Sequence, residues 1–194
     1  EPVLDLFEMI TGNRNSYAMF KVGGVRRDIE TAKIPAIEKV MDEIIKKTDL
    51  LAGAVMDDPV IHARTKGVGV LTRQDVIDYC AVGPTARASG VAIDVRRDDP
   101  YAAYPLVDWK VITAEGGDVF AKTEVRLLEM YESVSIIRQC LKGLLKEKEG
   151  DITVKVNEIP EGIGQGRAEA PRGEVFHFVV SDGSNSPVRH RIRA

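Results

Sequence analysis

Apolar residues recur every three or four positions in three stretches of the chain, a spacing that places them on one face of an α-helix. The first stretch, residues 3–12, stops at Gly12, a residue type that commonly ends helices. The second covers residues 31–51, with Thr31 as a candidate N-cap, and the longest covers residues 118–148. A helix of this last length spans roughly 45 Å and needs a partner of similar length. The pattern therefore predicts two long helices that pack antiparallel.

Shorter helices are predicted between the two long ones. Asp58 and Pro59 form a cap and first-turn pair of one helix. Thr72 begins another, which Gly83 ends. The next segment, "TARASG", residues 85–90, is rich in small side chains, which indicates close packing of one backbone against another.

After Gly150 the apolar period changes to two, as expected for strands that bury one face. The predicted strands are "ITVKVNEI", residues 152–159, "GEVFHFVV", residues 173–180, and "VRHRIRA", residues 188–194. The glycine-rich "EGIGQGR", residues 161–167, leads into a strand and not a helix, so we predict a flexible connector in preference to a phosphate-binding loop. The predicted fold class is α+β, a long-helix antiparallel bundle in residues 1–150 followed by a small antiparallel β-sheet in residues 151–194.

The last predicted strand has one basic face. Its alternation separates Arg189, Arg191 and Arg193 on one face from Val188, His190 and Ile192 on the other. A row of three arginines fits an acidic partner or an anionic lipid surface. A solvated face is the more common role of such a row and is the favoured interpretation.

Composition excludes several classes of protein. The 194 residues include 27 basic and 30 acidic side chains, for a formal net charge of -3. This balance argues against nucleic-acid binding, because neutralising several phosphates needs a clustered basic excess. No stretch reaches the length of about 18 apolar residues that a bilayer span needs. The chain begins with Glu1 instead of Met, and we expect it to be part of a longer protein.

The residue types that bind metals are sparse. Cys80 and Cys140 lie far apart in apolar helical settings, which predicts two buried, reduced thiols in a reducing compartment. The three histidines, His62, His177 and His190, are scattered. Local spacing therefore predicts no metal site made by this chain alone.

Residues 94–109 form an irregular segment of acids, arginines, prolines and aromatics. A loop of this length is uncommon in a compact domain, so we expect an interface or the wall of a site. Its acids Asp94, Asp98 and Asp99 would suit acid–base chemistry if they converged. The favoured interpretation is a salt-bridged surface.

One cation stands out in the β portion. Arg172 lies between Pro171, whose ring restricts the backbone, and Gly173, which permits close approach. A stiff turn of this kind aims a guanidinium at an anion or at a ligand on a metal. Glu169 and Glu174 are its predicted local partners if the role is a structural ion pair.

Ordered blocks along nearly the whole chain resemble a known family. Among them are "GPTARASGVAIDVRRDDPYAAY" and "EAPRGEVFHFVVSDGSNSPVRHRIRA". They are similar to the large subunit of membrane-bound, energy-converting nickel-iron hydrogenases and to the homologous D subunit of NADH:quinone oxidoreductase. Pro171, His177 and the segment "DDPYAAY" favour the hydrogenase branch.

In the hydrogenase branch, the resemblance implies that Arg172 and Pro171 lie near the diatomic ligands of a nickel-iron centre. Glu169 and His177 are weaker catalytic candidates. The family's metal-binding cysteine pairs are absent from this chain, so the ligands of the centre would come from outside it, and the chain alone is expected to be inactive. The parent subunit would act with an iron–sulfur small subunit and membrane ion-translocating subunits, in a peripheral arm at the cytoplasmic face of the membrane.

Two alternatives follow from the same resemblance. In the quinone oxidoreductase branch, this segment would support a quinone cavity and hold no metal. In a non-catalytic scaffold subunit, the fold would be kept without the chemistry. The isolated chain is expected to expose apolar surface and to self-associate.

Overall fold

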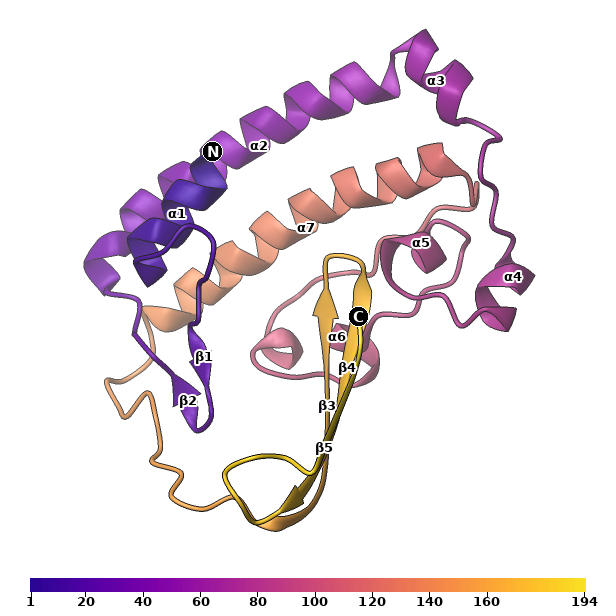
Figure 1. Cartoon of the computed structure of the whole chain (residues 1–194). Helices are drawn as coiled ribbons and strands as arrows, with labels where there is room; N and C mark the ends of the chain where they lie inside the picture. The colour runs from indigo at the N-terminus through magenta and orange to yellow at the C-terminus, as the bar shows by residue number, and fades with distance from the viewer.

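The computed structural model describes all of residues 1–194. Two long helices, α2 (Ile34–Met56) and α7 (Val119–Leu144), run antiparallel along one side of the molecule, and a three-stranded sheet lies across from them (Figure 1). The predicted α+β class, a long-helix bundle followed by a small antiparallel sheet, is confirmed. The sheet has the order β3-β4-β5, formed by β3 (Glu161–Ala170), β4 (Gly173–Asp182) and β5 (Arg189–Arg193).

The remaining elements are short. They are α1 (Pro2–Thr11), β1 (Phe20–Lys21), β2 (Gly24–Val25), the 3-10 helix η1 (Thr31–Lys33), α3 (Pro59–Thr65), α4 (Arg73–Asp78), α5 (Gly83–Arg87), α6 (Val95–Asp98) and the 3-10 helix η2 (Tyr104–Leu106). Strands β1 and β2 pair as a small hairpin. Helix α5 packs against α7 and β4, helix α6 packs against β3, and α4 lies at the right-hand margin of the view (Figure 1).

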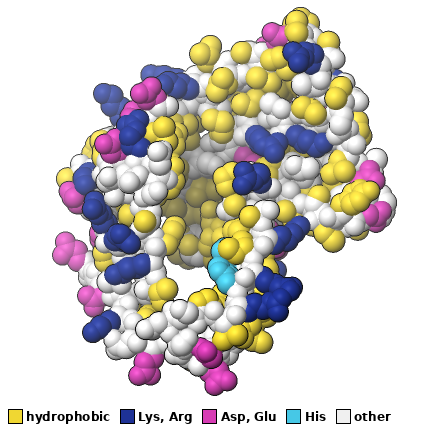
Figure 2. Space-filling model, viewed as in Figure 1, with side chains coloured by type: hydrophobic (Ala, Val, Ile, Leu, Met, Phe, Trp, Pro, Cys, Tyr) yellow, Lys and Arg dark blue, Asp and Glu magenta, His cyan; other side chains and the backbone are white.

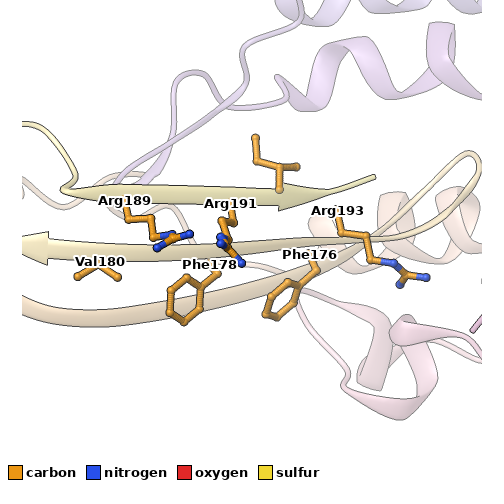
Figure 3. A pocket seen from close by; sticks show the side chains of 7 residues that line it. Phe176, Phe178, Val180, Arg189, Arg191 and Arg193 are labelled. Atoms are coloured by element: carbon orange, nitrogen blue, oxygen red, sulfur yellow. The ribbon is translucent and has the colours of Figure 1, made fainter.

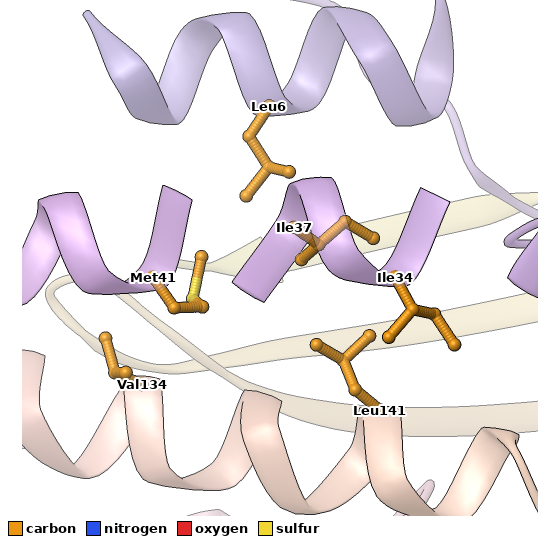
Figure 4. Packing of buried hydrophobic residues seen from close by; sticks show 6 residues of the cluster. All are labelled: Leu6, Ile34, Ile37, Met41, Val134 and Leu141. Atoms are coloured by element: carbon orange, nitrogen blue, oxygen red, sulfur yellow. The ribbon is translucent and has the colours of Figure 1, made fainter. Parts of the chain in front are cut away.

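The main core lies between the long helices and α1. Figure 4 shows its six buried residues: Leu6, Ile34, Ile37, Met41, Val134 and Leu141. The three-and-four spacing of the sequence places these side chains on facing stripes. Only part of the predicted stripe on α7 is buried, because Ile137 is 36% exposed and Leu145, just beyond the helix, is 60% exposed.

Local capping sets most helix ends as predicted. Gly12 ends α1 in the left-handed conformation at φ 80°. The Asp58 side chain accepts hydrogen bonds from two backbone N–H groups at the start of α3. Thr72 and Asp75 form a capping box at α4. The predicted N-cap Thr31 is wrong, because this residue is the first of η1 and its side chain makes no capping hydrogen bond to α2.

The β portion differs from the prediction in two segments. Residues 152–159 form no strand and make one isolated bridge, between Thr153 and Gly24. Residues 161–167, predicted to be a flexible connector, belong to β3. Ten residues of β4, whose apolar and polar side chains alternate, pair with ten residues of β3. This pairing outweighs the low strand propensity of glycine.

Two further expectations change. Cys80 is exposed and Cys140 is half-buried, so the prediction of two buried thiols is wrong. Gly83 begins α5, and α4 ends earlier, at Asp78. None of the helices combines the length and the apolar character that a membrane span requires. The division at residue 150 and the self-association of the chain stay predictions.

Candidate functional site

Arg87 is the centre of a buried ionic cluster. The residue is 1% exposed and its guanidinium contacts three carboxylates. The distances are 2.8 Å from Nε to Glu129 Oε1, 2.9 Å from Nη2 to Glu169 Oε1 and 3.2 Å from Nη1 to Asp94 Oδ2. These acids come from α7, from β3 and from the residue before α6. One side chain therefore connects the helical portion of the chain to the sheet.

A second cation completes the cluster. Arg96 binds Asp94 through two hydrogen bonds, of 2.9 Å from Nε to Oδ1 and 2.6 Å from Nη2 to Oδ2. Its guanidinium also lies 4.9 Å from the ring centre of Trp109, a cation–π distance. Burial lowers the pKa of Arg96, but the hydrogen bonds and charge of Asp94 raise it more, so the net pKa lies above its ordinary value. Two cations thus face three carboxylates.

The sequence builds this cluster through small residues. Ala86 and Ala88, on either side of Arg87, are both fully buried. Their side chains are short, so the surrounding backbone can pack close to Arg87. Arg87 Nη1 donates a further hydrogen bond, of 3.0 Å, to the carbonyl of Ile93. Because a guanidinium has five N–H donors in a fixed plane, it can satisfy several acceptors from different elements at once.

The turn between β3 and β4 lies against α5 (Figure 1). A Cβ atom on Gly83 would be 2.4 Å from the carbonyl oxygen of Arg172 and 2.4 Å from Cα of Gly173. Gly83 has φ 70° and Gly173 has φ 126°, conformations that favour glycine. Two glycines therefore allow one backbone to pack directly on the other, which holds the Pro171–Arg172 turn in place.

The predicted site residues occupy different environments. Pro171 and Arg172 are exposed in the turn, and no carboxylate lies within 4.0 Å of the Arg172 guanidinium among residues 1–194. The predicted pairing of Arg172 with Glu169 or Glu174 is wrong. Glu169 turns to the buried Arg87, and Glu174 has its nearest cation in Arg193, at 3.9 Å.

His177 is not brought together with Arg172. Its Nδ1 lies 2.9 Å from Nε2 of His190, and the two rings stack. The side-chain alternation of β4 also places His177 on the face of the sheet opposite to Glu174 and its cross-strand partner Glu169.

Sequence reasoning missed the central residue, Arg87. The signal in the sequence is a long charged side chain within the small-residue segment 85–90. Small residues let other parts of the backbone pack closely, and this packing can remove the arginine from water. The predicted salt-bridged surface is correct for Asp99, which pairs with exposed Arg167 at 2.7 Å. It is wrong for Asp94, which is 1% exposed.

The chain supplies no ligand set for a nickel-iron centre. No group of three or more His, Cys, Asp or Glu side chains in residues 1–194 is placed to hold a metal ion. The resemblance implies cysteine pairs as the ligands of such a centre, whereas Cys80 follows α4 and Cys140 lies on α7, each as an isolated free thiol. The residues of this chain therefore do not by themselves fit such a centre.

The cluster makes Glu169 sensitive to pH. Burial raises the pKa of its carboxyl, although the charge and hydrogen bond of Arg87 act in the opposite direction. The folded state then binds more protons than the unfolded state, so the free energy of unfolding falls as pH rises from the unfolded pKa of about 4.3 through the folded pKa. Below both values the contribution no longer changes with pH.

We expect Glu169→Gln to reduce this fall. The measurement is the free energy of unfolding of both proteins at a series of pH values from acid to neutral. Glu161→Gln, at the exposed far end of β3, is the matched control. A variant whose stability falls with pH as steeply as that of the unmodified chain would contradict the assignment.

Comparison with known proteins identifies the family of the chain. The family model described as "Respiratory-chain NADH dehydrogenase, 49 Kd subunit" matches residues 1–161 and 148–194. The D subunit of NADH-quinone oxidoreductase from a Dehalococcoides mccartyi strain is 38% identical over 196 residues, covering 100% of this chain and 53% of the relative. The same subunit of Geotalea uraniireducens is 36% identical over 221 residues, covering 100% of this chain and 56% of the relative.

A solved structure is also similar. It is that of the membrane-bound sulfane sulfur reductase, described as an archaeal respiratory membrane complex, with a TM-score of 0.89 and 31% identity. The match covers 98% of this chain and 53% of that chain.

The chain spans about half the length of the relatives that it matches. The named relatives support the quinone oxidoreductase alternative better than the hydrogenase interpretation. The suspected homology of the large subunit is confirmed. Because the family match extends over residues 1–194, the chain belongs to the family of the 49 Kd subunit of respiratory-chain NADH dehydrogenase.

Proposed function

We propose that the chain forms part of the large redox subunit of a respiratory membrane complex, and that its β3–β4 turn is one wall of the site where a quinone is reduced. The observation that carries this proposal is the position of Arg172. Its guanidinium is exposed and has no carboxylate partner in this chain, while the turn beneath it is fixed by Gly83 and by the buried pair of Arg87 and Glu169.

An anchored, unneutralised cation suits the chemistry of a quinone. A quinone takes up two electrons and two protons to become a quinol, and negative charge develops on its oxygens as the electrons arrive. A guanidinium held in position before the reaction stabilises that charge without having to reorganise. Arginine keeps its proton, so the protons would come from other groups or from water.

The partners are proposed from the same resemblance. An iron–sulfur subunit would deliver the electrons, and membrane subunits would couple the reaction to ion translocation, with this subunit in the peripheral arm at the cytoplasmic face. The iron–sulfur clusters belong to those partners in the proposal. Glu169 acts as a positioning residue through Arg87, and His177 has no proposed contact with the quinone.

A second candidate is the reduction of sulfane sulfur. The similarity to a sulfane sulfur reductase favours it, and an unneutralised arginine also fits an anionic sulfur chain. Proton reduction at a nickel-iron centre is less well supported, since the relatives carry quinone oxidoreductase names.

The decisive experiment replaces Arg172 in the full-length subunit within its complex. Arg172→Ala is expected to lower kcat/KM for the true acceptor by about 10²-fold, as for loss of one preorganised donor, while complex assembly is unchanged because the side chain is exposed. Arg172→Lys should recover part of the activity. Quinone reduction, polysulfide reduction and hydrogen evolution are measured in parallel.

Arg26→Ala is the matched control, because this arginine is also exposed and has no ion-pair partner. Loss confined to quinone reduction supports the first proposal, and loss confined to polysulfide reduction supports the second. Unchanged turnover in the Arg172 variants would favour a scaffold role for this part of the subunit.

A further inference from the structure

One face of the three-stranded sheet combines aromatic and basic side chains in register. Phe176, Phe178 and Val180 of β4 lie directly opposite Arg193, Arg191 and Arg189 of β5. These residues line a groove of about 690 Å³. Figure 3 shows the two phenylalanine rings and the guanidinium groups on the same side of the sheet. The groove is distinct from the β3–β4 turn that carries Arg172.

The positive charge of this groove is largely uncompensated. Arg189 and Arg191 have no carboxylate within 4.0 Å, and both are exposed (Figure 2 shows basic side chains gathered beside the sheet). Arg193 has only Glu174 nearby, at 3.9 Å, and donates a 2.7 Å hydrogen bond to the carbonyl of Cys80. The chain as a whole carries a net charge of -3. This face is therefore a local basic surface on an acidic chain.

The apolar side chains of the groove are less exposed than its charged ones. Phe176, Phe178 and Val180 are half-buried, while the arginines beside them are exposed. A membrane-binding surface presents aromatic side chains outermost, where they enter the lipid. Here the arginines are the exposed side chains and the rings beside them are half-buried, an arrangement that favours a charged polypeptide over a lipid surface.

The strand geometry indicates the shape of that molecule. Strand β5 is at the edge of the sheet and has one neighbour, β4. Arg189 and Arg191 are two residues apart on one strand face, a separation of roughly 7 Å. An extended polypeptide repeats its side chains on one face at the same interval, so two carboxylates in alternate positions match the two guanidinium groups.

We propose that this face docks an extended acidic segment of a partner subunit. Carboxylates at alternate positions of the segment pair with Arg189 and Arg191, and an apolar side chain of the segment packs on Phe176 and Phe178. This proposal replaces a solvated face, the interpretation of the arginine row that the sequence favours, because β4 places aromatic side chains in register beside the arginines.

The test uses the full-length subunit in its assembled complex. Phe178 is replaced by the photoreactive p-benzoylphenylalanine, and the cross-linked peptide is identified by mass spectrometry. We expect a cross-link to a peptide of another subunit with acidic residues in alternate positions. In the background of Arg189→Glu and Arg191→Glu, the cross-link yield should fall about ten-fold, as for loss of close charge pairs across an interface.

Two variants separate charge from folding. Arg189→Lys with Arg191→Lys keeps the charge and should retain most of the yield. Lys46→Glu with Lys142→Glu makes the same change in net charge on α2 and α7, and should leave the yield unchanged. A cross-link to lipid, to a second copy or to the same chain would overturn the proposal, as would no cross-link at all or a yield unaffected by reversal of the two arginines. Because none of these measurements depends on turnover, their outcome is independent of the proposed quinone site.

Discussion

Replacing Arg87 by methionine is expected to lower the free energy of unfolding by about 3–5 kcal/mol, because the loss of one partner leaves buried charges uncompensated. Three carboxylates converge on this guanidinium, and two of them, on Asp94 and Glu169, are at most 8% exposed at the side chain. Methionine fills a similar volume, so the effect reports the charge more than a cavity. Guanidinium unfolding of the chain, followed by circular dichroism, measures it.

Two comparisons test the cause of that loss. Arg126→Met, at an exposed arginine of α7, should change stability by no more than about 0.5 kcal/mol. Adding Asp94→Asn and Glu169→Gln to Arg87→Met should recover part of the loss, since the acids are then neutral. Equal stability of Arg87→Met and the unmodified chain would show that the cluster does not hold the two portions together.

Gly83→Ala is expected to displace the β3–β4 turn and to lower turnover of the full-length complex by on the order of 10²-fold, the effect of moving a positioned group by about 1 Å. The added Cβ would lie 2.4 Å from the carbonyl oxygen of Arg172. The atoms nearest to this Cβ all belong to the backbone of Arg172 and Gly173, so no side-chain rotation relieves the clash. The strained φ of 70° adds a loss of about 1–3 kcal/mol in stability.

The measurements are quinone reduction by the complex and thermal unfolding of the subunit. Gly173→Ala, whose Cβ would lie 2.7 Å from the backbone nitrogen of Gly83, should reproduce both effects. Gly53→Ala is the matched control, because nothing lies within 4 Å of the added atom in α2, and it should raise stability by up to about 1 kcal/mol. Normal turnover in both Gly83→Ala and Gly173→Ala would show that the position of the turn does not matter for catalysis.

The sequence predicts one part of the candidate site, the turn, but not its ion pairs. The sequence predicts the stiff turn at Pro171 and Arg172, because proline and glycine set backbone conformation locally. The ion-pair partners of the site were not found, since Arg87 meets Glu129 and Glu169 across 42 and 82 residues of chain. Proximity in sequence predicts an ion pair between Arg172 and Glu169, but Glu169 pairs with the buried guanidinium of Arg87 instead.

The sequence by itself determined those features that depend on residues a few positions apart. These include the end of α1 at Gly12, the cap of α3 by Asp58, the two long helices and the placement of the arginines on one face of β5. Each follows from capping, from helical periodicity or from strand alternation, all of which operate within one element.

Only the tertiary structure decided which charges are buried and which strands pair. The glycine-rich residues 161–167 form a strand because β4 offers backbone partners, and the alternating residues 152–159 lie outside the sheet. Asp94 was buried because Arg87 and Arg96 both reached it. The desolvation of a charge depends on every element packed around it, and distant elements meet only when the whole chain has folded.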